Sequence, residues 1–269
     1  MATIPSVVHH RFKENIKKFQ TIIAQAKDKD INEADTVTIV FDVLTSVFGY
    51  DKYNEITKEY VIKGTYCDLA VKVNGCVKFL IEVKAIGINL QKKHYQQALD
   101  YGANCGIEWI ILTNGINWQI YKVKFEKPIS TELICEMNFL DIKIKKNDLD
   151  KLFILCKEGI KKNAIDDFAQ HKMVVNKFFV TSIIQGEVVK DTIKRELKKI
   201  DSAIKPKDDE IYSIINNDII KRELIDSSDT SDASKKYHKI LKKGNRAKEN
   251  RAKESIQIIN VSSEMNIHR

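Results

Sequence analysis

The chain has 269 residues, of which 43% are hydrophobic and 30% charged, with a net charge of +8. This composition supports a buried core for one large or two small domains, and it excludes a wholly disordered, collagen-like or proline-rich protein. The N-terminus lacks the basic start and apolar core of a signal peptide, and no apolar stretch reaches the roughly 20 residues of a membrane span, which predicts a cytoplasmic protein.

The first 125 residues show helical spacing and then strand alternation. Apolar residues at helical spacing predict helices over residues 6–28 and 32–48, the second ending at Gly49. The period then changes to two from about residue 55 to residue 84. A polar segment compatible with a helix follows at 90–104. Two strands are then predicted at 109–113 and 117–123, joined by an Asn-Gly turn at residues 114 and 115. This order predicts an α/β sandwich built on a mixed sheet.

The rest of the chain has few strand signals. Amphipathic helices are predicted at 149–160, 173–200 and 211–225, followed by a Ser/Asp-rich linker at 226–232. Residues 235–253 contain nine Lys or Arg and one Glu, so this stretch alone accounts for the net charge of the chain. It is interpreted either as a flexible, solvated tail or as a nonspecific phosphate anchor. We therefore divide the chain into a domain at 1–140, a helical region at 141–225, and a linker with a basic tail at 226–269.

One predicted hairpin brings charged residues together. Residues 66–73 and 76–84 alternate, joined at Asn74-Gly75, with an apolar face at odd positions. Asp68, Glu82 and Lys84 then share the other face. A two-residue loop would separate the two acids, so this pattern requires a bulge or an odd connection, most simply of three residues with Gly75 at positive φ.

These three residues suit metal-dependent phosphodiester hydrolysis. Mg²⁺ prefers oxygen ligands, which Asp68 and Glu82 supply, with the Val83 backbone carbonyl as a further ligand. Lys84 can orient the attacking water or help to deprotonate it. The alternative is a solvated strand face on which Glu82 and Lys84 form an ordinary ion pair. The five cysteines stand singly with no Cys-x-x-Cys spacing, which favours reduced thiols over a zinc site.

A longer pattern surrounds the hairpin. Asp68, Glu82-Val83-Lys84 and then Gln97 with Tyr101 on the following helix resemble the PD-(D/E)xK nuclease motif with its Gln-x-x-x-Tyr extension. Over residues 8–125 the order of elements is similar to the N-terminal nuclease domain of type I restriction enzyme R subunits. The resemblance implies a restriction-endonuclease-like mixed sheet flanked by helices. It also implies an Mg²⁺-dependent DNA endonuclease of restriction or phage-defence type that uses metal-activated water, with Mn²⁺ as a substitute ion.

The resemblance also implies a role for each matching residue. Asp68 and Glu82 would bind the metal, and Lys84 would act on the water. Gln97 and Tyr101, one helical turn apart, would position DNA or the catalytic side chains, although Tyr101 can also be a packing residue. Glu33 corresponds to an acidic residue on the family's early helix and would complete the metal site, or it is simply an acid favoured at a helix start.

The sequence departs from the family in three respects. Cys67 stands where the motif has proline, no Gly-x-x-x-x-Gly-Lys-Ser/Thr loop is present, and the chain is too short for the helicase motor of R subunits. The helical region would then dimerise, bind DNA or dock on a separate helicase- or methyltransferase-type partner. A catalytically inactive module that binds DNA or a partner protein is the alternative function. The histidines are scattered, and His94, one turn before Gln97, is interpreted as a solvated residue.

Overall fold

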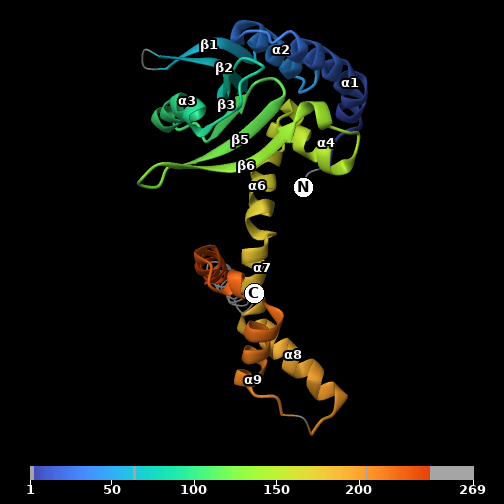
Figure 1. Cartoon of the computed structure of the whole chain (residues 1–269), viewed down its shortest axis with the longest axis vertical. Helices are drawn as coiled ribbons and strands as arrows, with labels where there is room; N and C mark the ends of the chain where they lie inside the picture. Colours follow the sequence, from blue (N-terminus) through green and yellow to red (C-terminus); the bar gives the residue numbers. More distant parts are fainter. Residues whose placement is uncertain (1–2, 63–64, 204, 243–269) are drawn as a thin grey trace, which may run out of the picture. The chain divides into compact units, whose positions relative to one another are not determined.

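The computed structural model describes residues 3–62, 65–203 and 205–242 (Figure 1). The chain divides into two compact units, Met1–His171 and Lys172–Arg269. Most of the predicted basic tail, residues 243–253, lies outside the described residues. None of the helices in the described ranges is long and apolar enough to cross a membrane.

The first unit is built on one six-stranded mixed sheet with the strands in chain order. The strands are β1 (Ile56–Ile62), β2 (Thr65–Val73), β3 (Cys76–Val83), β4 (Trp109–Thr113), β5 (Asn117–Lys124) and β6 (Ser130–Asn138). Neighbours pair antiparallel except β3 and β4, which are parallel and are connected through α3 (Lys92–Cys105). The predicted α/β class is confirmed. Strand β6 was not predicted, because polar and apolar residues do not alternate cleanly along it and its place is set by pairing with β5.

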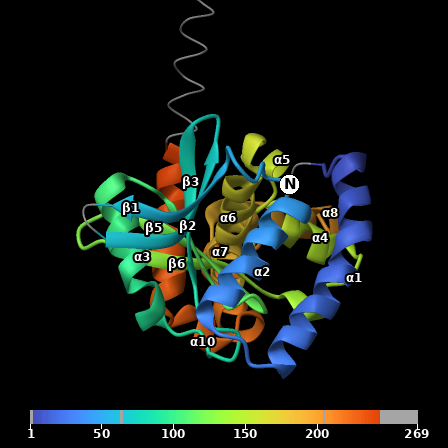
Figure 2. The ribbon, with the colours of Figure 1, turned by 90° about the horizontal axis from the view of Figure 1, so that it is seen from above.

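Helices cover both faces of this sheet. On one face lie α1 (Ser6–Asp28) and α2 (Glu33–Ser46), while α3 packs against β3 and β4 on the other (Figures 1 and 2). The bounds predicted for α1 are confirmed, since its apolar stripe is the buried face. Gly49 has φ +81° and a Cβ there would collide with the Arg11 guanidinium, which explains why the chain turns at a glycine.

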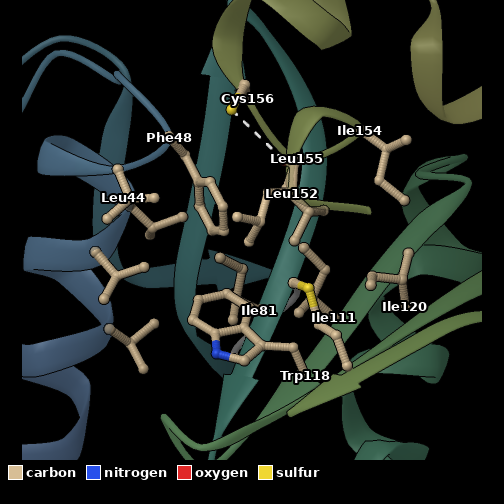
Figure 3. Packing of buried hydrophobic residues seen from close by; sticks show 14 of the residues in the cluster. Leu44, Phe48, Ile81, Ile111, Trp118, Ile120, Leu152, Ile154, Leu155 and Cys156 are labelled. Carbon is tan, nitrogen blue, oxygen red and sulfur yellow. Dashed lines mark hydrogen bonds between the residues drawn. The ribbon is translucent and has the colours of Figure 1, made fainter. Parts of the chain in front are cut away.

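The core of the first unit extends beyond residue 140. Phe48 and Trp118 meet edge to face at 5.5 Å, and Leu152, Leu155 and Cys156 pack above them (Figure 3). The packing residues come from α4 (Lys146–Phe153), α5 (Lys157–Lys161) and the first part of α6 (Ala164–Val174). Residues 141–171 therefore belong to the same compact unit as the sheet, whereas the predicted boundary lay at residue 140.

The predicted helix at 149–160 is two helices in the structure. Cys156 is extended, with φ −73° and ψ 149°, and it separates α4 from α5. A Cβ at Gly159 would lie only 1.9 Å from the Phe153 carbonyl oxygen, so the chain turns back closely upon itself here. Helical spacing alone does not reveal this break, because the buried positions 149, 152, 153, 156 and 160 keep a helical period across it.

The second unit is helical, as predicted for this part of the chain. It contains α7 (Lys177–Ile184), α8 (Glu187–Ile200), α9 (Asp208–Ser213), a π-helical turn η2 (Ile214–Ile219), α10 (Arg222–Ile225) and a helix over residues 228–242. The predicted continuous helix at 173–200 is interrupted at Asn176 and Gly186, which cap α7 and α8. Residues 228–232 of the expected linker are helical, because Ser227 Oγ accepts a hydrogen bond from the Asp229 amide and starts that helix.

Candidate active site

The β2–β3 hairpin places both predicted acids on one face. Its turn has two residues, Asn74 (φ 53°) and Gly75 (φ 78°), so the simplest expectation of a three-residue connection is wrong. An Asn-Gly turn of this kind matches the twist of the strands. The required shift comes from a bulge instead: Val71 pairs with Phe79 and Lys72 with Val77, which leaves Lys78 unpaired. Beyond the bulge Leu69 pairs with Ile81, and the next residues along, Asp68 and Glu82, share a face.

Asp68 holds the end of this strand pair. Its Oδ2 accepts a hydrogen bond of 2.7 Å from the Val83 amide, beyond the last paired residues Leu69 and Ile81. The pKa of Asp68 is raised, chiefly because the carboxyl is partly buried, while the Val83 amide and the Lys84 charge oppose the rise. The Val83 amide therefore fixes the position of the Asp68 carboxylate at the edge of the strand pair.

Glu82 and Lys84 lie side by side at the end of β3. Lys84 Nζ is 2.8 Å from Glu82 Oε1. Glu82 is only 4% exposed, and its Oε2 is buried without a hydrogen-bond partner in the described part of the chain. Burial and the neighbouring Asp68 raise the pKa of Glu82 to about 7, against the pull of Lys84. Burial acts to lower the pKa of Lys84, but Glu82, Glu33 and Asp68 outweigh it and the pKa is raised, so Lys84 is an ammonium ion.

Glu33 reaches the same group from another layer of the fold. It is the first residue of α2, which Asn32 caps by accepting a hydrogen bond of 2.9 Å from the Asp35 amide. Its side chain is 49% exposed, and its Oε2 lies 3.5 Å from Lys84 Nζ. The position of Glu33 is compatible with both interpretations from the sequence. It is an acid at a helix start, where acids are favoured, and it also pairs with Lys84 beside the proposed metal ligands.

A buried asparagine fixes the chain that follows Lys84. The Lys84 amide donates to the Thr113 carbonyl at 2.8 Å, which holds the end of β3 against β4. Asn114 Nδ2 then donates to the carbonyls of Ile86 and Ile88 at 3.2 and 2.9 Å. The sequence predicted only a turn at Asn114-Gly115. The hydrogen bonds of the Asn114 side chain to the loop after β3 were not predicted, because that loop is distant in sequence. The only signal for these bonds was an asparagine between two apolar strands.

The helix that carries the Gln-x-x-x-Tyr pattern is α3, on the same face of the sheet as the acids. Gln97 and Tyr101 lie in this helix, but their side chains are outside the described part of the structure. His94, in the first turn, is described: its Nδ1 accepts a hydrogen bond of 3.1 Å from the Gln91 amide. Partial burial lowers its pKa, together with the charges of Lys93 and Lys84, while Glu33 opposes them. The start of α3 is therefore within electrostatic reach of the site.

The residues present fit a divalent cation chemically. Two neighbouring carboxylates have raised pKa values, and one of their oxygens, Glu82 Oε2, is buried and unpaired within the described residues. A hard divalent cation, which prefers oxygen ligands, would bind that oxygen and offset the repulsion between the Asp68 and Glu82 carboxylates. Among the described residues no group of three or more His, Cys, Asp or Glu forms a ready metal cage. Mg²⁺ in proteins is commonly held by one or two carboxylates, with water and substrate completing its shell.

One comparison with known proteins gives a match. Residues 39–137 match the model of the family described as type I restriction enzyme R protein N terminus (HSDR_N). The matched segment covers under half of the chain and includes Asp68, Glu82, Lys84, Gln97 and Tyr101, but Glu33 precedes it. No curated protein and no solved structure matches the chain. The resemblance inferred from the sequence is confirmed for this segment.

Proposed function

We propose that the chain is a divalent-metal-dependent DNA endonuclease of restriction or phage-defence type. The observation that carries this proposal is the buried Glu82 carboxylate, which has one oxygen on Lys84, the other without a partner among the described residues, and Asp68 beside it. An unpaired buried carboxylate oxygen costs stability, so it needs a functional reason. The match of the surrounding segment to a restriction-enzyme family supports DNA as the substrate.

In this proposal Asp68 and Glu82 hold Mg²⁺ or Mn²⁺, with the Val83 carbonyl and Glu33 as additional ligands. When bound, the ion supplies a Lewis acid for the phosphate and lowers the pKa of water. Asp68 is suited to this because its Oδ2 is already fixed by the Val83 amide, which orients the other oxygen.

Lys84 contributes a positive charge and hydrogen-bond donors at the same place. The raised pKa keeps it protonated at neutral pH, with Glu82 and Glu33 fixing its position at 2.8 and 3.5 Å. It can therefore orient the attacking water and stabilise the negative charge that develops on the phosphate. The predicted roles of Gln97 and Tyr101, to position DNA or the catalytic side chains, are part of the same proposal.

The two ion pairs of Lys84 favour a second candidate function, a catalytically inactive module. Lys84 lies between two carboxylates, an arrangement that also occurs in purely structural networks. In that case the chain would bind DNA or a partner protein without cutting. The two candidates differ in what happens to DNA when the three residues are changed one at a time.

Plasmid nicking in Mg²⁺ and in Mn²⁺ tests the proposal. Asp68→Asn, Glu82→Gln and Lys84→Met keep the size of each side chain and remove its charge. Each should reduce cleavage by at least about 100-fold, the usual scale for losing one electrostatic contact in an active site. Lys124→Met and Glu132→Gln are matched controls, because this Lys–Glu pair joins β5 and β6 at 2.7 Å in the same sheet. Both controls should cut as the wild type does.

Two outcomes would contradict the proposal. Equal cleavage by the wild type and all three site variants would show that the chemistry lies elsewhere. No cleavage by a folded wild type, combined with tight binding of a fluorescent duplex in Ca²⁺, would favour the inactive binding module.

A further inference from the structure

The segment that follows Lys84 is held by one buried side chain, that of Asn114 directly after β4. Asn114 is 3% exposed, and its Nδ2 donates hydrogen bonds to the carbonyls of Ile86 and Ile88 at 3.2 and 2.9 Å. Ile86 is itself buried in the core. The first residues after β3 are therefore tied to the interior of the first unit through a single side-chain amide.

The turn that carries Asn114 is itself firmly held. The Asn114 Oδ1 accepts hydrogen bonds from the amides of Ile116 and Asn117 at 3.1 and 2.7 Å. The fully buried Trp118 donates from Nε1 to the Gly115 carbonyl at 3.1 Å. A side-chain amide has two N–H donors and an oxygen with two lone pairs, and Asn114 uses both of its ends on backbone groups. Such a fully satisfied buried group favours one arrangement of the segments that it joins.

Lys84 depends on the same turn for its own backbone. Its amide donates to the carbonyl of Thr113, the residue before Asn114, at 2.8 Å. Its Nζ lies between two acids, 2.8 Å from Glu82 Oε1 and 3.5 Å from Glu33 Oε2. A lysine side chain has many rotamers, so this placement of Nζ requires that the backbone on both sides of Lys84 keep its path. Strand β3 holds one side, and Asn114 holds the other.

We propose that Asn114 is a positioning residue for Lys84. By holding the carbonyls of Ile86 and Ile88, it keeps the Lys84 ammonium group between its two acidic partners, where it acts on the attacking water and the phosphate. This inference rests on the proposed function, since it assigns a task in catalysis to a residue whose hydrogen bonds go to backbone groups. The expected effect is on turnover and not on substrate binding, because a small displacement of a catalytic group lowers the rate by up to about 100-fold.

Two matched substitutions test this role. Asn114→Ser removes both bonds to the loop, because a serine side chain is too short to reach the two carbonyls, while its hydroxyl still offers an acceptor to the turn. Gln20→Ser is the control. Gln20 on α1 also holds a loop with its side-chain amide, through bonds from Nε2 to the carbonyls of Phe139, Leu140 and Ile142 at 3.1, 3.2 and 2.8 Å. Both variants should unfold at a lower temperature than the wild type.

Plasmid nicking below both unfolding temperatures separates positioning from stability. We expect Asn114→Ser to lower kcat roughly 10- to 100-fold with KM within about twofold of the wild-type value, and Gln20→Ser to keep both constants. Should Asn114→Ser fail to fold, Asn114→Asp takes its place with Gln20→Glu as its control, since Asp keeps the acceptor for the turn and lacks the donors. Equal kcat in the wild type and a folded Asn114 variant would overturn the inference, as would an equal loss in variant and control.

Combination with Lys84→Met shows whether the effect passes through Lys84. If Asn114 acts by placing the ammonium group, adding Asn114→Ser to Lys84→Met should change the residual cleavage by less than about twofold. Independent effects multiply, so a further loss of roughly 10- to 100-fold in the double variant would overturn the inference.

The NMR signal of the Lys84 side chain keeps the inference separate from the proposed function, because this measurement needs no DNA. The Lys84 Cε–Hε cross-peak, assigned by its absence from Lys84→Met, should shift in Asn114→Ser and stay in place in Gln20→Ser. If the wild type does not cut DNA, the proposed function fails, and that pair of results would still support Asn114 as the residue that places Lys84. An unchanged Lys84 signal in Asn114→Ser would overturn the inference even where the proposed function holds.

Discussion

The first unit contains two partly buried ion pairs, Arg11–Glu158 and Lys84–Glu82, which differ in how completely the carboxylate is hydrogen-bonded. Arg11 binds Glu158 through two parallel hydrogen bonds of 2.9 and 2.7 Å, and Arg11 Nε also donates to the Val47 carbonyl. Both oxygens of Glu158 are thus satisfied, and although burial opposes it, the bonds to Arg11 lower the pKa of Glu158. This pair joins α1 to the start of α5 and stabilises the fold.

The pair of Lys84 and Glu82 differs in one essential respect. Only one Glu82 oxygen is bonded, the other is buried without a partner in the described structure, and burial with Asp68 nearby raises the pKa to about 7. The site pair therefore costs stability where the Arg11 pair provides it. The proposed metal site therefore rests on an incompletely satisfied carboxylate, and not on the presence of an ion pair as such.

The sharpest test of this contrast is to neutralise each acid in turn. Glu82→Gln should abolish most metal-dependent cleavage, by at least about 100-fold, because it removes a proposed metal ligand. It should also unfold at a higher temperature than the wild type in EDTA at pH 8, since the buried charge is gone. A plasmid-nicking assay beside thermal unfolding measures both. A lower unfolding temperature would show that Glu82 is an ordinary structural carboxylate.

Glu158→Gln should have the opposite effect. It leaves the partly buried Arg11 guanidinium with one strong partner fewer, and we expect a loss of roughly 2 kcal/mol in the free energy of unfolding. Cleavage at low temperature should stay near that of the wild type. Urea unfolding and plasmid nicking on the same sample provide the measurement, and an active-site effect in this variant would mean that the two pairs are coupled.

The pH dependence of stability should also separate the two acids. The pKa of Glu82 rises from 4.5 in the unfolded chain to about 7 in the folded one, so the folded state binds a proton that the unfolded state releases. Stability in EDTA should therefore fall as pH rises from about 4.5 to 7, by roughly 1 to 3 kcal/mol from this group. Glu158 has a lowered pKa, and its contribution is lost only below pH 4.5.

Comparison of the wild type with Glu82→Gln isolates this effect from other titrating groups. The variant should be the more stable protein at pH 8, and the two unfolding free energies should converge near pH 5. A constant difference across this range would contradict the assignment of the titration to Glu82.

Added metal should produce the smallest of these changes. At a free Mg²⁺ concentration ten times its dissociation constant, binding to the folded state alone adds about 1.4 kcal/mol. The wild type should gain this stability at pH 8, while Glu82→Gln and Asp68→Asn should gain much less. Calorimetric unfolding with and without Mg²⁺ measures the gain, and equal gains in all three proteins would place the metal elsewhere.

Local patterns in the sequence were sufficient for much of the fold. The helix at 6–28, the alternating strands and the Asn-Gly turns depend on neighbouring residues, and the structure shows them where they were predicted. The match over residues 39–137 confirms the family resemblance. The catalytic and metal-binding roles of Asp68, Glu82, Lys84, Gln97 and Tyr101 remain predictions.

Other features depend on contacts that no local pattern contains. The choice of a bulge at Lys78 over a longer turn follows from the packing of both strand faces at once. The pairing of Glu33 with Lys84 and the bonds of Asn114 to the loop after β3 join segments 26 to 51 residues apart. Helix α3 packs against β3 and β4, and Lys84 and Glu33 act electrostatically on His94 in its first turn.

The sequence by itself determined which residues could do the chemistry, because side-chain type and alternation are local properties. It also determined the sheet-forming and helix-forming segments up to about residue 125. Only the tertiary structure decided that residues 141–171 complete the same core, and that one oxygen of Glu82 is buried without a partner in the described part of the chain. Burial and its effect on charge arise from distant segments packing together, so they appear only when the chain is folded.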